Sequence, residues 1–479
     1  MKRTVTIQTL IFQLAAFLLL AATSGCVEPL VPDFPETGGP RSMTLRIQLP
    51  GADGLLTKAI TDYNIPGSDA ERAVHTVQVW AFKHGEEAVL TYATFTPSNA
   101  LENPVKLTLE FPDDVMDESY GSNAALNLDF YVLVNGASVG VSDSTGLSTR
   151  QQIKDKTFGH TATTDPFGAT LVSAVPSEGL PMSGYFDGDG AGFDILFLKY
   201  GFSQAQLNVV ENKVKTQDTD FSDPAAAMQA NTVQAAYLQS LITQYSIDSW
   251  EKLWKKLCPV IRVTRAVAKV RFVFAKAETM SAATKITSLE LIDIAATATS
   301  PSPMLPGLVY AFPRENGAFQ IPSTTNESLV WLGTAIPGGG NEPLVANDDF
   351  VGKTIDTPLR LRWDSNIKSA GQEKAPCDMD SLATYERFLT AEIADNHAID
   401  KVLYLRESGE EDIYCRIGYQ IADGEEKQVD IPIPAGATFH RNTWWTVYAY
   451  FMSYELGFQV IAAPWDGIGS SSNENSHLQ

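Results

Sequence analysis

The sequence predicts a mainly β protein of two β-sandwich domains with a short helical insertion between them. The clearest observation is residues 261–274, where small, β-branched and aromatic residues alternate with Arg265, Lys269 and Arg271. A period of two with these residue types is typical of a strand with one buried and one solvated face. Further strand-like runs follow, and helical spacing occurs mainly in residues 201–258. We therefore expect residues 261–274 to open a second β-domain.

The first 25 residues predict a lipoprotein signal peptide. They contain a basic start, an apolar run from Leu10 to Ala22 and small residues before Cys26. The run is shorter than the roughly 20 apolar residues that a spanning helix needs. A cysteine directly after Ser24-Gly25 is typical of a bacterial lipoprotein, in which the Cys26 sulfur is lipidated. An ordinary signal peptide with an incidental cysteine is the alternative.

Residues 26–43 are expected to form a tether, because they are rich in proline and glycine. The first sandwich is predicted over residues 44–200. Its first strand is Thr44–Leu49, a strict alternation that places Leu45, Ile47 and Leu49 on one face. We expect these three side chains to lie in the core of the sandwich, since a linker has no need of a period of two.

Three further strands are predicted in the first domain, over residues 75–82, 105–111 and 126–134. The last of these ends in Asn135-Gly136, a dipeptide that is typical of tight turns. Strands separated by long polar loops favour a β-sandwich over an α/β fold. The domain is expected to close near residues 180–184.

The insertion, residues 201–258, is predicted to contain two short amphipathic helices. Apolar and aromatic residues recur there at helical spacing, including Trp250 and Trp254. Such a stripe is typical of a packing face, so we expect these side chains to pack beside the sandwiches.

The second sandwich is predicted over residues 259–466, followed by a polar tail over residues 467–479. Asp423-Gly424 is expected to be a hairpin turn. The clearest strands are residues 401–406, 413–421, 445–451 and 456–460.

Composition argues against several classes of partner. A formal charge of −22 makes a nucleic-acid partner unfavourable, because phosphate binding needs clustered Lys and Arg. Besides Cys26 the chain has only Cys258, Cys377 and Cys415, and no CxxC pair. Neither a disulfide framework nor a zinc site is predicted, although one bridge stays open; buried thiols are the favoured interpretation.

No catalytic constellation is recognisable, so we expect no enzymatic activity and no cofactor. The six histidines are scattered, and no nucleophile elbow, HExxH or phosphate-binding loop occurs. Residues 187–192 (Asp-Gly-Asp-Gly-Ala-Gly) are similar to a calcium loop, but Ala191 stands at the third acidic position and Leu198 at the twelfth. We interpret them as a surface turn and predict no metal site.

Several short motifs, in order along most of the mature chain, resemble landmarks of the fimbrillins, the lipoprotein subunits of Bacteroidales (type V) pili. The first landmarks are the lipoprotein signal, the early strand Thr44–Leu49 and the loop after it, which contains the basic residue Lys58. Seven short motifs follow. These motifs are Glu71–Phe82, Phe130–Asn135, Leu180–Gly184, Arg265–Val270, Tyr404–Glu407, Arg441-Asn442 and Pro464-Trp465.

The resemblance implies two transthyretin-like sandwiches and assembly by donor-strand exchange. In the family, a trypsin-like protease removes the lipid, the tether and the first strand, and a strand of a neighbouring subunit fills the groove. Here the cleavage would fall at Lys58-Ala59 and release Leu45, Ile47 and Leu49; Arg72 is the nearest rival site. The family's best-known members have Arg where this chain has Lys58, and residues after Trp465 are poor in apolar side chains.

The resemblance therefore favours a structural, adhesive subunit of a fimbrium, anchored to the outer membrane through lipid and exposed at the cell surface. Its partners would be other pilus subunits and a ligand on a host or bacterial surface. A pilus anchor or tip subunit that keeps its own first strand is one alternative. A surface glycan-binding lipoprotein is the other, although Trp250, Trp254 and Trp444 are each expected to be packed.

Overall fold

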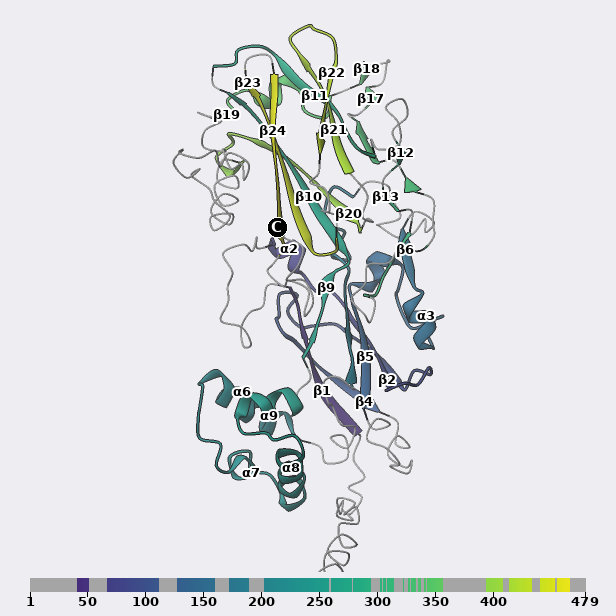
Figure 1. Cartoon of the computed structure of the whole chain (residues 1–479), viewed down its shortest axis with the longest axis vertical. Coiled ribbons are helices and arrows are strands. Elements are labelled where there is room, and N and C mark those ends of the chain that lie inside the picture. The colour runs from purple at the N-terminus through teal and green to yellow at the C-terminus, as the bar shows by residue number, and fades with distance from the viewer. Residues whose placement is uncertain are drawn as a thin grey trace, which may run out of the picture. The chain divides into compact units, whose positions relative to one another are not determined.

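The computed structural model describes residues 41–50, 67–111, 127–159, 172–188, 202–257, 260–293 apart from 278, parts of 302–355, 393–407, 413–432, 440–452 and 455–465. Residues 41–479 cluster as one compact unit, whose described part is mainly β, as predicted (Figure 1). Among these residues no helix is long and apolar enough to span a bilayer.

The first sandwich contains a three-stranded sheet with β1 in the middle. β1 (Arg41–Gln48) pairs antiparallel with β4 (Val105–Phe111) and parallel with β8 (Val260–Arg262). β4 alternates buried and exposed residues from end to end, which gives this part of the sheet one inward and one outward face.

The other sheet of the first sandwich has five strands, of which β2 (Val77–Lys83) and β5 (Leu128–Val134) are buried on both faces. Trp80 and Tyr131 on one face join a core cluster that extends to the second sandwich. Val79 and Val132, which alternate with them, are also fully buried. In spatial order the strands are β3 (Thr91–Phe95), β2 (Val77–Lys83), β5 (Leu128–Val134), β7 (Met182–Phe186) and β9 (Thr264–Arg265).

The stretch 261–274, predicted as one strand, is divided among three sheets. β8 lies beside β1, β9 pairs with β7, and β10 (Val267–Ala277) enters the second sandwich. Between β8 and β9, Val263 N donates to the Gln48 carbonyl, and between β9 and β10, Ala266 N donates to the Pro181 carbonyl. Both bonds tie the chain to the first sandwich where it passes from one sheet to the next. A two-residue period cannot reveal such a change of sheet, because the backbone stays extended.

The predicted solvated face of residues 261–274 is wrong for β10. All residues from Val267 to Lys276 are buried. Side chains such as Phe272 face the core of the second sandwich, whereas Val267 and Val273 on the opposite face join the cluster shared with the first. A strand covered on both faces buries its polar positions too, which requires partners for them.

The second sandwich is formed by two five-stranded sheets. Phe272 and Val447 of one sheet share a core with Leu289 and Ile417 of the other. The first sheet orders β19 (Thr354–Ile355), β10, β23 (Thr443–Met452) and β24 (Glu455–Pro464), with β20 (Ile399–Arg406) also on β10. The second orders β12 (Ser302–Pro303), β11 (Thr284–Asp293), β21 (Ile413–Ile421) and β22 (Lys427–Pro432), with β16 (Leu329–Leu332) also on β11.

The four strands predicted in this domain are all present, and Asp423-Gly424 lies in the turn between β21 and β22, as predicted. The remaining described strands form two-stranded pairs. They are β6 (Thr157–Gly159) with β14 (Leu308–Tyr310), β13 (Leu305–Pro306) with β15 (Asn326–Glu327), and β17 (Ala335–Ile336) with β18 (Gly340–Asn341).

The helical insertion contains more helices than the two predicted. They are α6 (Gln204–Lys215), α7 (Pro224–Ala227), α8 (Thr232–Gln244) and α9 (Trp250–Leu257). α9 buries its predicted stripe of Trp and Leu side chains. The other described helices are short: α2 (Asp69–Arg72), η3 (Gly136–Val139), α3 (Arg150–Lys154) and η5 (Asn347–Phe350).

Asn135-Gly136 does not form the predicted tight turn. Asn135 takes a left-handed conformation with φ of 56° and leads into η3. Its side chain is fully buried and bonds four backbone groups, accepting from the amides of His75 and Thr76 and donating to the carbonyls of Ala73 and Leu180. The dipeptide therefore joins three segments instead of reversing the chain.

At the predicted end of the first domain, residues 182–184 belong to a strand, β7. A side chain at Gly184 would collide with the carbonyl oxygen of Arg262. The glycine is required because the segment that leads from β8 to β9 passes directly over β7.

Candidate functional site

The predicted removable strand is built into the core of the first sandwich. Met43, Leu45, Ile47 and Leu49 are each 0–2% exposed, which confirms that the alternating residues lie in the core. Leu45 lies opposite Leu107 and Ile47 opposite Val105 on β4. The inward face of β1 is thus fully engaged.

The backbone of β1 is paired on both sides. β4 pairs with it from Arg41 to Ile47, and β8 pairs with it from Arg46 to Gln48. Removal of β1 would therefore open a slot between two strands, and not the single free edge that a terminal strand would leave. Both walls of such a slot would present unpaired amide and carbonyl groups to an incoming strand.

The helical insertion covers the outward face of β1 at Arg46. Arg46 is only 1% exposed, and its Nη2 donates to Glu211 Oε2 of α6 at 3.0 Å. Its guanidinium carbon lies 3.7 Å from the ring centroid of Trp254 in α9. Nε and Nη1 are buried without a hydrogen-bond partner in the described structure.

Glu211 receives three cations. Besides Arg46, Lys215 Nζ lies 2.9 Å from Oε1 and Lys106 Nζ of β4 lies 3.2 Å from Oε2. Burial alone would raise the pKa of Glu211, but the hydrogen bonds from Lys215 and Lys106 and the charge of Arg46 lower it to about 2. The carboxylate is therefore ionised across the physiological range.

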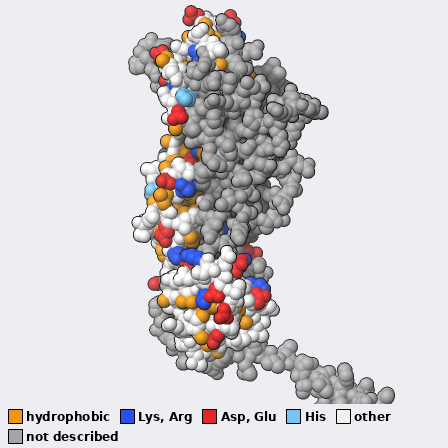
Figure 2. All heavy atoms as spheres, turned by 90° about the vertical axis from the view of Figure 1, so that its left-hand side faces the viewer, with side chains coloured by type: hydrophobic (Ala, Val, Ile, Leu, Met, Phe, Trp, Pro, Cys, Tyr) orange, Lys and Arg blue, Asp and Glu red, His pale blue; other side chains and the backbone are white. Residues whose placement is uncertain are grey.

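Figure 2 views the molecule from the left-hand side of Figure 1, where α6 to α9 are drawn. Acidic, basic and apolar side chains are interspersed over its lower part (Figure 2). The outer surface of the insertion is thus mixed in charge. The ion pairs of Glu211 with Arg46 and Lys106 lie on the side of the insertion that faces β1 and β4.

The predicted processing residues, Lys58 and Ala59, and the predicted lipidation residue, Cys26, lie outside the described residues. The segment 51–66 joins the end of β1 to α2. The rival site, Arg72, is the last residue of α2, and its neighbour Glu71 is 2% exposed. The Arg72 side chain is 40% exposed, but cleavage after it would require the helical backbone of α2 to unfold.

Glu71 lies at the centre of a buried polar cluster. Its Oε1 is 2.6 Å from Lys269 Nζ of β10 and accepts the Tyr404 hydroxyl of β20 at 2.7 Å. Arg265 donates to the Glu71 carbonyl through Nε and Nη2, at 3.3 Å each. Burial opposes ionisation of Glu71, but Lys269 and the hydrogen bonds outweigh it and lower its pKa.

The same cluster includes the late motifs of the sequence. Asn442 accepts from Arg265 and donates to the Trp465 carbonyl, and Arg265 lies over the Trp465 ring at 4.1 Å. Arg441 pairs with Glu407 through two nitrogens, at 2.8 and 2.9 Å. The motifs that carry the fimbrillin resemblance therefore converge in space, where they join α2 to the second sandwich.

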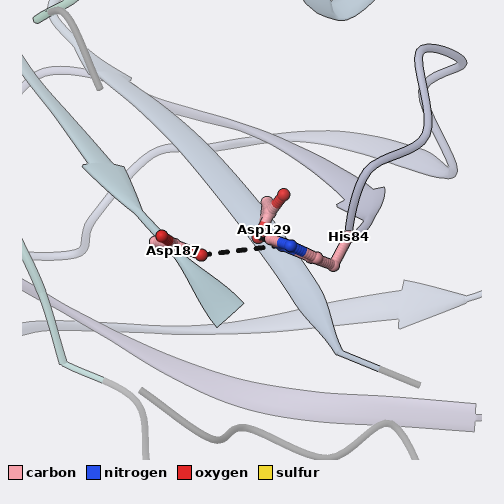
Figure 3. Close-up of side chains that lie close together, drawn as sticks. All are labelled: His84, Asp129 and Asp187. Atoms are coloured by element: carbon pink, nitrogen blue, oxygen red, sulfur yellow. Dashed lines mark hydrogen bonds and ion pairs between the residues drawn. The ribbon is translucent and has the colours of Figure 1, made fainter. Parts of the chain in front are cut away.

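A third group of titratable side chains lies at the start of β5, where Asp129 is the second residue of the strand (Figure 3). His84 Nδ1 is 3.0 Å from Asp129 Oδ1 and 3.5 Å from Asp187 Oδ1. Asp129 is buried and also contacts the Arg150 guanidinium at 2.9 Å and the Gly188 amide at 2.8 Å. Asp129 therefore has one cationic partner, Arg150, and the three side chains connect β5 with the residues that directly follow β2 and β7. Asp187, the first residue of the calcium-like loop, is exposed.

The tryptophans and the described cysteine are packed. Trp250, Trp254 and Trp444 are buried, as predicted, so none of them presents a ring face for a sugar. Cys415 is a buried free thiol whose burial raises its pKa. Cys258 and Cys377 lie outside the described residues.

Arg46 and Glu211 were missed by the sequence analysis. Arg46 stood at an outward position of an alternating strand, where an exposed side chain is the usual outcome. A local signal for α6 does exist: Ser203 and Gln206 form a capping box, a Ser-x-x-Gln pattern visible in the sequence.

No family model matches the chain, and no curated protein matches it. Among solved structures, it resembles a protein from Parabacteroides distasonis assigned to cell adhesion, at 12% identity and a TM-score of 0.42, over 90% of this chain and 98% of that one. A tip fimbrial protein from Porphyromonas gingivalis gives 9% identity and 0.40, over 88% and 100%. A fimbrial assembly protein from Parabacteroides distasonis gives 10% and 0.35, over 88% and 98%.

The first of these solved structures is described as a cell adhesion protein and the other two as fimbrial proteins. With TM-scores below 0.5, they assign no role to any residue of this chain.

Proposed function

We propose that this chain is a structural, adhesive subunit of a cell-surface pilus, exported as a lipoprotein through Cys26 and assembled by strand exchange after cleavage at Lys58-Ala59. It has no enzymatic role in this proposal. One observation carries it: β1 is a middle strand that is joined to the rest of the chain only through residues 51–66. A cut in that segment would free β1 without dividing any other described element.

The energetics of such an exchange follow from burial. Four buried side chains, three of β1 and Leu49 directly after it, would leave the core. Each contributes about 1.5–3 kcal/mol, or roughly 6–12 kcal/mol in total. The emptied slot would recover this only from a strand with the same alternation, as in donor-strand complementation. A neighbouring pilus subunit is the natural source of that strand.

A second candidate is an anchor or tip subunit that keeps its own first strand and its lipid. The burial of Arg46 against Glu211 and Trp254 favours it, because these contacts hold β1 in place. The two candidates differ in whether the segment 51–66 is cut in the cell.

The test is N-terminal sequencing of protein taken from cells, combined with Lys58→Ala. A polymerising subunit is expected to begin at Ala59, and Lys58→Ala is expected to stay monomeric and membrane-bound. Arg72→Ala is the matched control, since it removes the rival basic residue and should still be processed. Filaments built by Lys58→Ala would show this route to be wrong, and a wild type that still begins at Cys26 would favour the anchor.

A further inference from the structure

We propose that Glu211 and Trp254 form a receptor that admits to the β1 slot only strands carrying an arginine at the position of Arg46. This inference rests on the proposed strand exchange and adds the identity of the partner strand. The fitting partner is a strand of a neighbouring subunit with an outward arginine between two inward aliphatic residues, as in Leu45-Arg46-Ile47.

The receptor is built from elements outside the sandwich. Glu211 lies on α6 and Trp254 on α9, two helices that pack on each other. Both helices precede β8, the strand that forms one wall of the slot. The insertion therefore covers the outward face of whichever strand lies beside β8, and it does so at the position of Arg46.

The contacts suit an arginine better than other side chains. A carboxylate at 3.0 Å and an indole face at 3.7 Å address the same guanidinium. The planar guanidinium can stack on a ring and donate to a carboxylate together, which the compact ammonium of lysine does less well.

Specificity explains this arginine better than stability does. Arg46 is buried with Nε and Nη1 lacking hydrogen-bond partners in the described structure. Replacement of both members of a buried ion pair by apolar side chains often costs no stability, whereas removal of one member leaves the other without that partner. Glu211 keeps Lys106 and Lys215 as partners when Arg46 is absent, so its carboxylate stays ionised and lacks only the hydrogen bond from the arginine of the strand.

The test uses the full chain with a specific protease site placed within residues 51–66. After nicking, β1 stays bound without a covalent link, and exchange is followed with a labelled peptide of residues 41–50 just below the Tm. The competing peptides are the unchanged sequence, Arg46→Met, and Arg46→Met with Gln48→Arg. The last keeps the peptide charge but moves the arginine two residues along the same face.

We expect the unchanged peptide to bind about tenfold to a hundredfold more tightly than either variant, the range for a charged hydrogen bond. The preference should fall below about threefold in Glu211→Gln. It should persist in Glu251→Gln, a matched change on an exposed pair of α9.

Equal binding of all three peptides would overturn the receptor while leaving strand exchange intact. Equal binding of the two arginine-bearing peptides would show mere attraction to an acidic protein, which also overturns it. If no peptide enters a nicked protein that remains folded, the proposed exchange fails, and the receptor fails with it. The peptide series uses the unmutated receptor, so it does not depend on the folding of Glu211→Gln.

Discussion

The buried pair of Glu71 and Lys269 offers the sharpest test of the contacts that join α2 to the second sandwich. In Lys269→Met the carboxylate of Glu71 would stay buried with only the Tyr404 hydroxyl and the Ser68 amide as partners. Loss of one member of a buried pair typically costs about 3–5 kcal/mol, because the other charge is left uncompensated. With side chains 7% and 2% exposed, we expect a cost of about 4 kcal/mol.

The pH dependence of this cost has a defined sign. In the wild type the pKa of Glu71 is lowered below 4.5, so its contribution is present above that value and is lost as the pH falls through the folded pKa. In Lys269→Met burial is the dominant remaining influence and would raise the pKa of Glu71. A raised pKa contributes stability at low pH that is lost as the pH rises. The deficit of the variant should therefore shrink between pH 8 and pH 5.

Urea unfolding monitored by tryptophan fluorescence at each pH measures the free energy of unfolding and its pH dependence. Calorimetry at the same pH values provides an independent measurement. The double variant Glu71→Gln with Lys269→Met should cost less than half as much as the single one, since no charge is left buried. Lys255→Met, which breaks an exposed pair with Glu251, should change the free energy of unfolding by less than about 1 kcal/mol. If Lys269→Met is as mild as Lys255→Met, or if its deficit grows on acidification, the reasoning is refuted.

Three further predictions concern β1 and its anchor. Ile47→Asp should lower the free energy of unfolding of the precursor by about 3–5 kcal/mol in urea titration. The control Thr108→Asp, on the exposed face of β4, should be nearly neutral. An unchanged Tm in Ile47→Asp would contradict the assignment of Ile47 to the core. The pKa of Glu211 is lowered to about 2, so acidification from pH 5 to pH 2.5 should remove about 2–3 kcal/mol of stability that Glu211→Gln does not show, and parallel acid profiles would count against it. Cys26→Ala should release the protein from the membrane fraction, and a wild type without lipid by mass spectrometry would refute the anchor.

The sequence predicted strands correctly where one face of the strand is exposed to solvent and the other is buried. Leu45 and Ile47 on β1, and Leu107 on β4, alternate with polar residues, and such a pattern fixes both the strand and its inward face. The same rule failed at Lys269, whose polar side chain is buried because Glu71 and Tyr404 come to it from segments far away in the chain. A pattern of local residues contains no record of such remote partners.

The helical insertion shows the complementary limit. The Trp and Leu stripe of α9 has the spacing of a packing face, and the structure places it so. α6 was not predicted, because it has few apolar residues and its clearest sequence signal is the capping box of Ser203 and Gln206. The residue that matters most on it, Glu211, looked like one more acidic side chain in an acidic protein.

The two faces of β1 divide binding strength from discrimination. Its inward residues, such as Leu45 and Ile47, are ordinary aliphatic side chains, so any strand of matching alternation would recover most of the same burial. Such burial holds a strand firmly but distinguishes poorly between similar strands. Arg46 lies on the outward face, where a mismatched strand would leave the Trp254 ring uncovered and would deprive Glu211 of one hydrogen bond. Such a loss separates a correct strand from a near-correct one. A slot of this design would accept many strands by their inward face and reject most of them by a single residue on the other.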